Sequence, residues 1–326
     1  MIKGGFGALR FALLFLFSVT VVCVLAHADQ PTATRIGVIY PLGSATFAEG
    51  LRDGLHQAGY SEGSNLTVEW RRPSETEGEL RSVVSDLVRS KVDLIVTTGT
   101  PAARAALQGA ALPVVFLSGD PVRAGLATSL AKPGGNGTGV SALTPELEVK
   151  RLELLHQLAP KARRIGYLNS LSNPQSKRQI PGFEAAARGL GVQIEILDAA
   201  DPGELDVALR ALQENPPEAL QVAANVFFLP HSAAIARAAR KSRIPAMYAY
   251  REFVEDGGLA SYGPDLKRIG GVMAGYVVKI LKGAKPSELP IEQMSEYELV
   301  INLRVARELR IKVPQELLLR ADEVIR

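Results

Sequence analysis

Short aliphatic runs alternate along the chain with longer segments whose apolar residues recur at the helical period. In GELRSVVSDLVRSKVD, Leu80, Val84 and Leu87 have the spacing of one helix face. TPELEVKRLELLHQLAP predicts another helix, with Thr144 as its N-cap and Pro145 in its first position. Strands are predicted in RIGVIYPLG, NLTVEWRR, VDLIVTTGT and PVVFLSGD. This alternation predicts an α/β protein with parallel sheets covered by helices on both faces.

The alternation begins again in the second half of the chain. RIGYLNSLSNPQS resembles RIGVIYPLGSATF, which places the two halves in register at Ile36 and Ile165. Two such halves predict two doubly wound parallel-sheet lobes, and the strand and helix patterns of the tail predict a multi-crossing hinge between them. We expect lobe 1 to contain residues 29–141 plus about 262–296, and lobe 2 to contain residues 142–261 plus about 297–326.

The first 28 residues have the pattern of a secretory signal peptide. Lys3 and Arg10 give a basic start, and FALLFLFSVTVVCVLA is an apolar stretch of signal-peptide length. Ala26, His27 and Ala28 fit a small-x-small cleavage site, so we expect cleavage after Ala28 and export to the periplasm. An uncleaved membrane anchor is the alternative.

Composition narrows the chemistry that we expect of the chain. Its 326 residues are 47% hydrophobic and carry a formal net charge of +3, which does not indicate a nucleic-acid surface. Cys23 is the only cysteine and lies in the expected signal peptide, so a mature chain would have no disulfide. The histidines lack metal-ligand spacing, GGNGTG lacks the spacing of a dinucleotide fingerprint, and neither a G-x-S-x-G elbow nor a Walker loop occurs. We expect no metal, no cofactor and no catalytic residues.

Small polar residues follow most of the predicted strands. In an open parallel sheet, ligands bind outside the carboxyl ends of the strands, so these residues are candidates for a binding site. Tyr40 and Tyr250 are the aromatic residues that we expect to face a cleft. The polar strand ends are residues 40–44, 97–101, 118–121, 169–173, 225 and 248–252.

The turn GTPAAR is the most suggestive of these ends. Thr100 can cap a helix, Pro101 fits its first position, and Gly99 permits close approach of a ligand to the backbone. A helix start leaves about four backbone N–H groups unpaired and carries a partial positive charge. No acidic side chain fills this start, so Thr98, Gly99 and Thr100 are candidates to bind a carboxylate. The alternative is an ordinary capped turn.

Two further loops leave alternatives open. Ser172, Asn173 and Ser176 in NSLSNPQSKR either offer hydrogen-bonding groups to a ligand or form ordinary turn structure. Asp120 either accepts a hydrogen bond from a ligand ammonium or caps the segment that follows it.

Five segments carry a resemblance that covers nearly the whole chain after the signal peptide. They are GLRDGLHQAGYSEGSNLTVEWR, DLIVTTGTPAARAA, PVVFLSGDPVRAGLATSLAKPGGNGTGVSALTPELEVKRLELL, GGLASYGPDL and YELVINLRVARELRIKVPQELLLRADEVI. In these segments the chain resembles the ABC-transporter substrate-binding proteins of the tryptophan- and tyrosine-type group. The resemblance implies a type I periplasmic-binding-protein fold with three crossings. It also implies a monomer without enzymatic activity that captures a small solute in its cleft and delivers it to a membrane permease.

The resemblance also implies a pocket made by both lobes. NVFFLP lacks the acidic residue expected beside the asparagine in amino-acid binders of this group, which leaves the ammonium of an amino acid without that partner. Two other functions stay open, namely an exported module that presents its ligand to a membrane receptor and an exported hydrolase. Carried over to this chain, the pocket includes Tyr40, Thr98, Gly99, Thr100, Asp120, Asn169, Ser172, Asn173, Ser176, Asn225 and Glu252.

Overall fold

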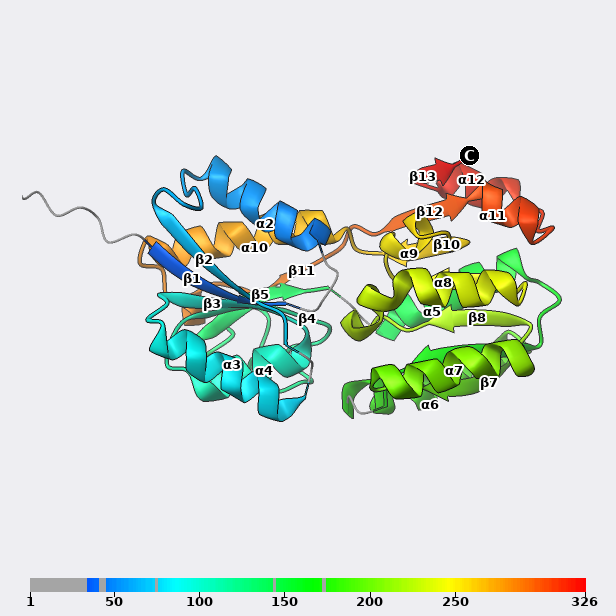
Figure 1. Cartoon of the computed structure of the whole chain (residues 1–326), viewed down its shortest axis with the longest axis horizontal. Helices are drawn as coiled ribbons and strands as arrows, with labels where there is room; N and C mark the ends of the chain where they lie inside the picture. The colour runs from blue at the N-terminus through cyan, green and yellow to red at the C-terminus, as the bar shows by residue number, and fades with distance from the viewer. Residues whose placement is uncertain (1–33, 41–44, 74–75, 143–144, 172–173) are drawn as a thin grey trace, which may run out of the picture.

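The structure, a computed structural model, describes residues 34–40, 45–73, 76–142, 145–171 and 174–326. Its strands form one six-stranded sheet and one seven-stranded sheet, and helices cover both faces of each sheet (Figure 1). The predicted α/β fold with two doubly wound lobes is therefore confirmed.

The first lobe is built around the six-stranded sheet, whose strand order is β11-β5-β4-β3-β1-β2 with every neighbouring pair parallel. Its elements are β1 (Thr34–Ile39), α2 (Ala45–Gln57), β2 (Leu66–Arg71), α3 (Glu77–Arg89), β3 (Leu94–Thr98), α4 (Thr100–Gly109), β4 (Val114–Ser118), β5 (Gly137–Ser141), α10 (Leu266–Leu281), η2 (Pro286–Glu288) and β11 (Glu292–Gln293). Because β1 lies between β2 and β3, the order reverses between β1 and β3. Ligands of open α/β sheets bind at such a switch point.

The second lobe is built around the seven-stranded sheet, in the order β13-β12-β10-β9-β8-β6-β7. Its elements are α5 (Pro145–Leu158), β6 (Arg164–Asn169), α6 (Pro174–Gly189), β7 (Gln193–Asp198), α7 (Pro202–Glu214), β8 (Ala219–Val222), η1 (Val226–His231), α8 (Ser232–Lys241), β9 (Ala246–Tyr248), α9 (Glu252–Glu255), β10 (Ala260–Gly263), β12 (Glu298–Asn302), α11 (Leu303–Glu308), α12 (Gln315–Arg320) and β13 (Glu323–Ile325). β12 runs antiparallel to β10, and the other pairs are parallel. Here the switch point lies between β6 and β8.

The chain crosses between the two sheets three times, after β5, after β10 and after β11. The predicted multi-crossing hinge is therefore present. Each of these three connections joins one lobe to the other. Relative motion of the lobes therefore requires a change of backbone conformation in the connections.

α2 packs closely against α10, and this packing fixes the position of α2 in the first lobe. A Cβ atom at Gly50 would lie 1.9 Å from the carbonyl oxygen of Lys267, and one at Gly270 would lie 2.4 Å from the carbonyl oxygen of Phe47. Neither distance is possible for a real side chain, so only glycine allows this crossing. The rigid helix pair then holds Thr46 in the first turn of α2.

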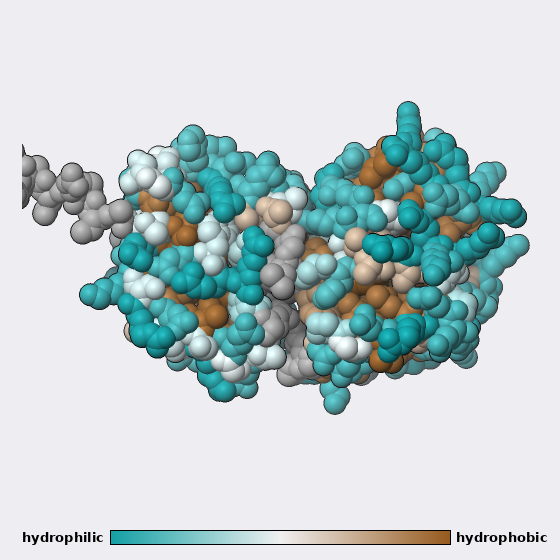
Figure 2. Space-filling model, viewed as in Figure 1, coloured by the Kyte–Doolittle hydropathy of each residue, from teal (hydrophilic) through white to brown (hydrophobic). Residues whose placement is uncertain are grey.

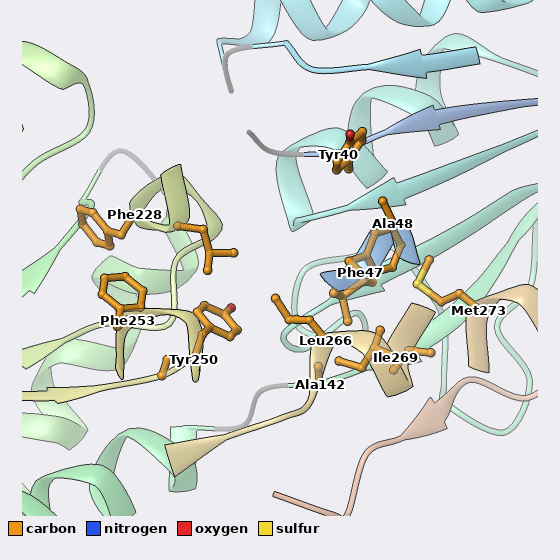
Figure 3. Close-up of a cluster of buried hydrophobic side chains, with 14 of the residues drawn as sticks. Tyr40, Phe47, Ala48, Ala142, Phe228, Tyr250, Phe253, Leu266, Ile269 and Met273 are labelled. Carbon is orange, nitrogen blue, oxygen red and sulfur yellow. The ribbon is translucent and has the colours of Figure 1, made fainter. Parts of the chain in front are cut away.

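A buried apolar cluster continues from one lobe into the other. Figure 3 shows Tyr250 of the second lobe on the side that faces Leu266 and Phe47 of the first. On the face seen in Figure 2, the two lobes are rounded bodies with a mostly hydrophilic surface. The lobes are therefore in apolar contact at this junction, and the residues of the cluster include Tyr40, Phe47, Leu266, Ile269, Phe228, Tyr250 and Phe253.

Candidate functional site

The start of α4 leaves backbone donors open at the switch point of the first sheet. Gly99, the N-cap residue, has φ +92° and ψ +143°, a conformation that favours glycine. No side chain caps the helix, Pro101 has no N–H, and the first turn contains no acidic residue. Among the described residues, the N–H groups of Thr100 and Ala102 have no backbone acceptor. This start is suited to an acceptor from outside the chain.

Hydroxyl groups surround this helix start. The Thr100 Oγ1 lies 2.9 Å from the Ser118 Oγ at the end of β4. Thr97 and Thr98 are buried, and within the part of the chain that the structure describes their Oγ1 atoms have no hydrogen-bond partner. A buried hydroxyl without a partner costs free energy, so a ligand that supplies one would be stabilised here.

Asp120 holds its own loop together. Its Oδ1 accepts a hydrogen bond from the backbone N–H of Arg123 at 3.0 Å, and its Oδ2 lies 3.4 Å from the Arg123 Nε. Asp120 was expected either to accept a hydrogen bond from a ligand ammonium or to cap the segment that follows it. These contacts with Arg123 are those of a cap.

The switch point of the second sheet contributes two asparagines. Asn169 ends β6 and is buried, and its Oδ1 accepts from the N–H of Ser170 at 2.8 Å. Asn225 follows β8 and is the N-cap of η1, where its Oδ1 accepts from the N–H of Phe227 at 2.9 Å. Their side-chain amides hold the two strand ends in defined conformations.

A buried ion pair that sequence reasoning missed supports the Asn225 loop. Glu148 of α5 accepts from the N–H of Ala224 at 3.0 Å and from the Gln221 Nε2 at 2.9 Å. The Arg151 Nη2 lies 2.7 Å from the Glu148 Oε1, and this arginine is fully buried. The i,i+3 pairing of opposite charges between Leu147 and Leu152 was the signal in the sequence.

A cavity of about 720 Å³ runs along α3 and α4 of the first lobe and reaches the strand ends of the second lobe at Ser170 and Asn225. Both lobes contribute to its walls, with Thr100 and Pro101 on one side and Ser170 and Asn225 on the other. Two of the predicted residues, Thr100 and Asn225, therefore line one cavity. Two others are sequence neighbours of lining residues: Gly99 precedes Thr100, and Asn169 precedes Ser170. This volume is in the range of small-molecule sites.

Three other predicted residues are buried or join the lobes outside the lining of this cavity. Tyr40 is buried, and its hydroxyl accepts from the Arg72 Nε at 2.6 Å. Tyr250 is buried in the same cluster (Figure 3). Glu252 at the start of α9 accepts from the Thr46 Oγ1 of α2 at 2.5 Å, so this hydrogen bond joins the lobes.

The environment of Glu252 disfavours its charged form. Burial raises the pKa of this carboxyl above its ordinary value, and the hydrogen bond from Thr46 only partly opposes the rise. Within the described residues, the Glu252 Oε2 is buried without a partner.

The remaining predicted residues lie elsewhere. Ser172 and Asn173 are outside the described residues. Ser176 is half-buried on α6 and does not line the cavity.

Two further properties of the described residues concern metal binding and membrane insertion. No group of three or more His, Cys, Asp and Glu side chains is placed to hold a metal ion. None of the described helices combines the length and apolar composition that a membrane span requires.

Comparison with known proteins gives consistent matches. A family model described as ABC transporter substrate binding protein matches residues 36–325. A tyrosine-binding protein of Clostridioides difficile is 28% identical over 257 residues, which cover 78% of this chain and 73% of that protein.

Two solved structures differ in how well they superpose. An ABC domain in complex with L-Trp from Streptococcus pneumoniae is 30% identical and has a TM-score of 0.81, and the match covers 90% of this chain and 99% of that one. A ligand-free, open substrate-binding protein with adhesive properties from Clostridium difficile is 25% identical over the same shares of each chain, with a TM-score of 0.62.

Proposed function

Because this chain belongs to the family of ABC transporter substrate-binding proteins, we propose that it captures a small carboxylate-bearing ligand between its lobes and delivers it to an ABC permease. Its fold is that of the type I periplasmic-binding proteins. The family is one of solute-binding proteins, and we propose no enzymatic role for this member.

One observation carries the proposal, namely that an uncapped helix start opens beside a cavity whose walls come from both lobes. The ligand carboxylate accepts hydrogen bonds from the N–H groups of Thr100 and Ala102 and from the Thr98 hydroxyl. The amide of Asn225 contacts the ligand from the opposite wall, on a strand end held by Asn169. The partial positive charge of a helix start favours an anion there.

The closeness of the two lobes supports a mechanism of closure around the ligand. The lobe arrangement superposes better on the L-Trp complex than on the ligand-free, open structure, at similar identity and equal coverage. The Thr46–Glu252 hydrogen bond and the buried Tyr250 join the lobes in this arrangement. Closure buries the ligand and completes its hydrogen bonds, and the permease then binds the closed conformation.

The remaining assignments belong to the same proposal. The chain is exported, loses its signal peptide after Ala28 and acts as a periplasmic monomer. Tyr40, Tyr250 and Glu252 contact the less polar end of the ligand at the lobe junction. The lobe limits are residues 29–141 plus about 262–296 and residues 142–261 plus about 297–326. The sheet membership of the strands supports them except at β10, which extends the second lobe to Gly263.

The test is thermal unfolding of the purified protein against a panel of small acids and amino acids, L-Trp and L-Tyr included. A ligand at 100 times its Kd stabilises the folded state by about 2.7 kcal/mol, which raises the Tm by about 5 °C or more. A panel in which no small acid or amino acid raises the Tm would contradict the proposal.

A further inference from the structure

Arginines dominate the charge of the cleft cavity. Arg81 and Arg104 lie on its first-lobe wall with Arg123, and Arg178 of α6 lies on its second-lobe wall. Among the described residues that line the cavity, Glu77 alone is acidic.

Two of these arginines have carboxylate partners. The Arg81 Nη1 lies 2.7 Å from the Glu77 Oε1, and the Arg123 Nε lies 3.4 Å from the Asp120 Oδ2. Their positive charges therefore already have a carboxylate of the protein beside them, although both arginines are exposed.

The other two arginines have no carboxylate partner. Arg104 donates from its Nη2 to the backbone carbonyl of Ala124 at 2.8 Å, an acceptor without formal charge. Arg178 has neither an ion pair nor a hydrogen bond to any other residue that the structure describes. Two unbalanced cations thus lie on opposite walls of one cavity.

Unbalanced charges of one sign on opposite walls resist closure of the lobes. Like charges repel more strongly as water leaves the space between them, so the cost rises as the walls approach. An anion between the walls reverses the sign of this interaction, and arginine is suited to planar oxyanions because its guanidinium donates two parallel hydrogen bonds.

Resting on the proposed function, we infer that the ligand carries two separate anionic groups and is therefore at least a dianion. One carboxylate binds at the start of α4, and a second oxyanion group, a carboxylate or a phosphate, lies between Arg104 and Arg178. The ammonium of an amino acid would meet two cations in this cavity, where the lining carboxylate of Glu77 is already paired. Charge complementarity therefore favours a dianion over a zwitterion.

The experiment is calorimetric titration of the full chain with matched probes. The probes are unbranched dicarboxylates of three to six carbons, 3-phosphoglycerate, the monocarboxylates of equal length, L-Trp and L-Tyr. We expect at least one dianionic probe to bind about 10-fold or more tightly than its monocarboxylate match. Binding of dicarboxylates, of 3-phosphoglycerate or of both identifies the second group.

Variants then assign the charge to its residues. Arg104→Gln and Arg178→Gln should each weaken the dianion about 10-fold and leave a monocarboxylate nearly unchanged. Arg81→Gln is the control, since this lining arginine already has a partner, and it should change affinity less than about twofold.

The outcomes separate this inference from the proposed function. Binding of monocarboxylates or amino acids as tight as that of any dianion, insensitive to Arg104→Gln and Arg178→Gln, overturns the dianion and leaves capture of a small acid intact. Absence of binding by every probe overturns both.

Discussion

Replacement of Gly99 by valine tests whether the start of α4 binds the ligand. At φ +92° the residue occupies backbone space that valine avoids, and holding it there costs about 1–3 kcal/mol. This is a fraction of the roughly 5–15 kcal/mol that stabilises a typical folded protein, so the variant should fold with a Tm lower by about 2–12 °C. The ligand would also lose close approach to the N–H groups of Thr100 and Ala102. At about 1.5–3 kcal/mol for each hydrogen bond to a charged group, affinity should fall about 100-fold or more.

The assay is calorimetric titration, with a matched variant that separates strain from binding. Gly59 has φ +89°, has open space around its Cβ position and does not line the cavity. Gly59→Val should therefore carry a similar cost in stability and keep the affinity of the unmodified protein. Equal affinities in Gly99→Val and Gly59→Val would refute the reasoning, because the helix start would then be only a structural turn.

Three further predictions concern stability, each measured by urea unfolding. Removing one partner of the buried Glu148 pair, in Arg151→Ala, should cost about 3–5 kcal/mol because an uncompensated charge stays buried; a loss under 1 kcal/mol would contradict this. Burial raises the pKa of Glu252 in the folded protein, so protonation of this carboxyl stabilises the folded state. This stabilisation is fully present below the ordinary pKa of 4.5 and is lost as pH rises through the raised pKa. Glu252→Gln should therefore lose less stability than the unmodified protein as pH rises above 4.5, and parallel curves would contradict the assignment. Tyr40→Phe removes the hydrogen bond from Arg72 and should lower the free energy of unfolding by about 0.5–1.5 kcal/mol. An unchanged free energy of unfolding would contradict this prediction and would indicate that Arg72 finds another acceptor.

Local patterns were enough to predict the lobes and the helix start. The strand VDLIVTTGT and the helix PAARAALQGA became β3 and α4, although the N-cap of α4 is Gly99 and not Thr100, which is the first residue of the helix. Such features follow from hydrophobic periodicity and from backbone preferences of a few neighbouring residues, which a sequence carries directly.

Contacts between distant segments were not predictable in the same way. Tyr40 and Tyr250 were expected to face a cleft, and both are buried. Tyr40 packs beside Trp70 and Arg72 of its own lobe, and Tyr250 lies on the side of the second lobe that faces the first (Figure 3). Glu148 and Ala224 are 76 residues apart, so their hydrogen bond depends on the packing of α5 against the second sheet. The same holds for Thr46 and Glu252, which meet only because α2 and α9 come together across the hinge.

The most direct measurement of ligand capture is the distance between the lobes with and without ligand. Spin labels at Ser85→Cys on α3 and Ala185→Cys on α6, both exposed positions, report it by pulsed electron resonance in the chain from Asp29 onward, which contains no other cysteine. Capture between the lobes predicts a broad distance distribution in the free protein that becomes shorter and narrower at saturating ligand. An unchanged distribution, with ligand bound by calorimetry, would contradict capture by closure of the lobes.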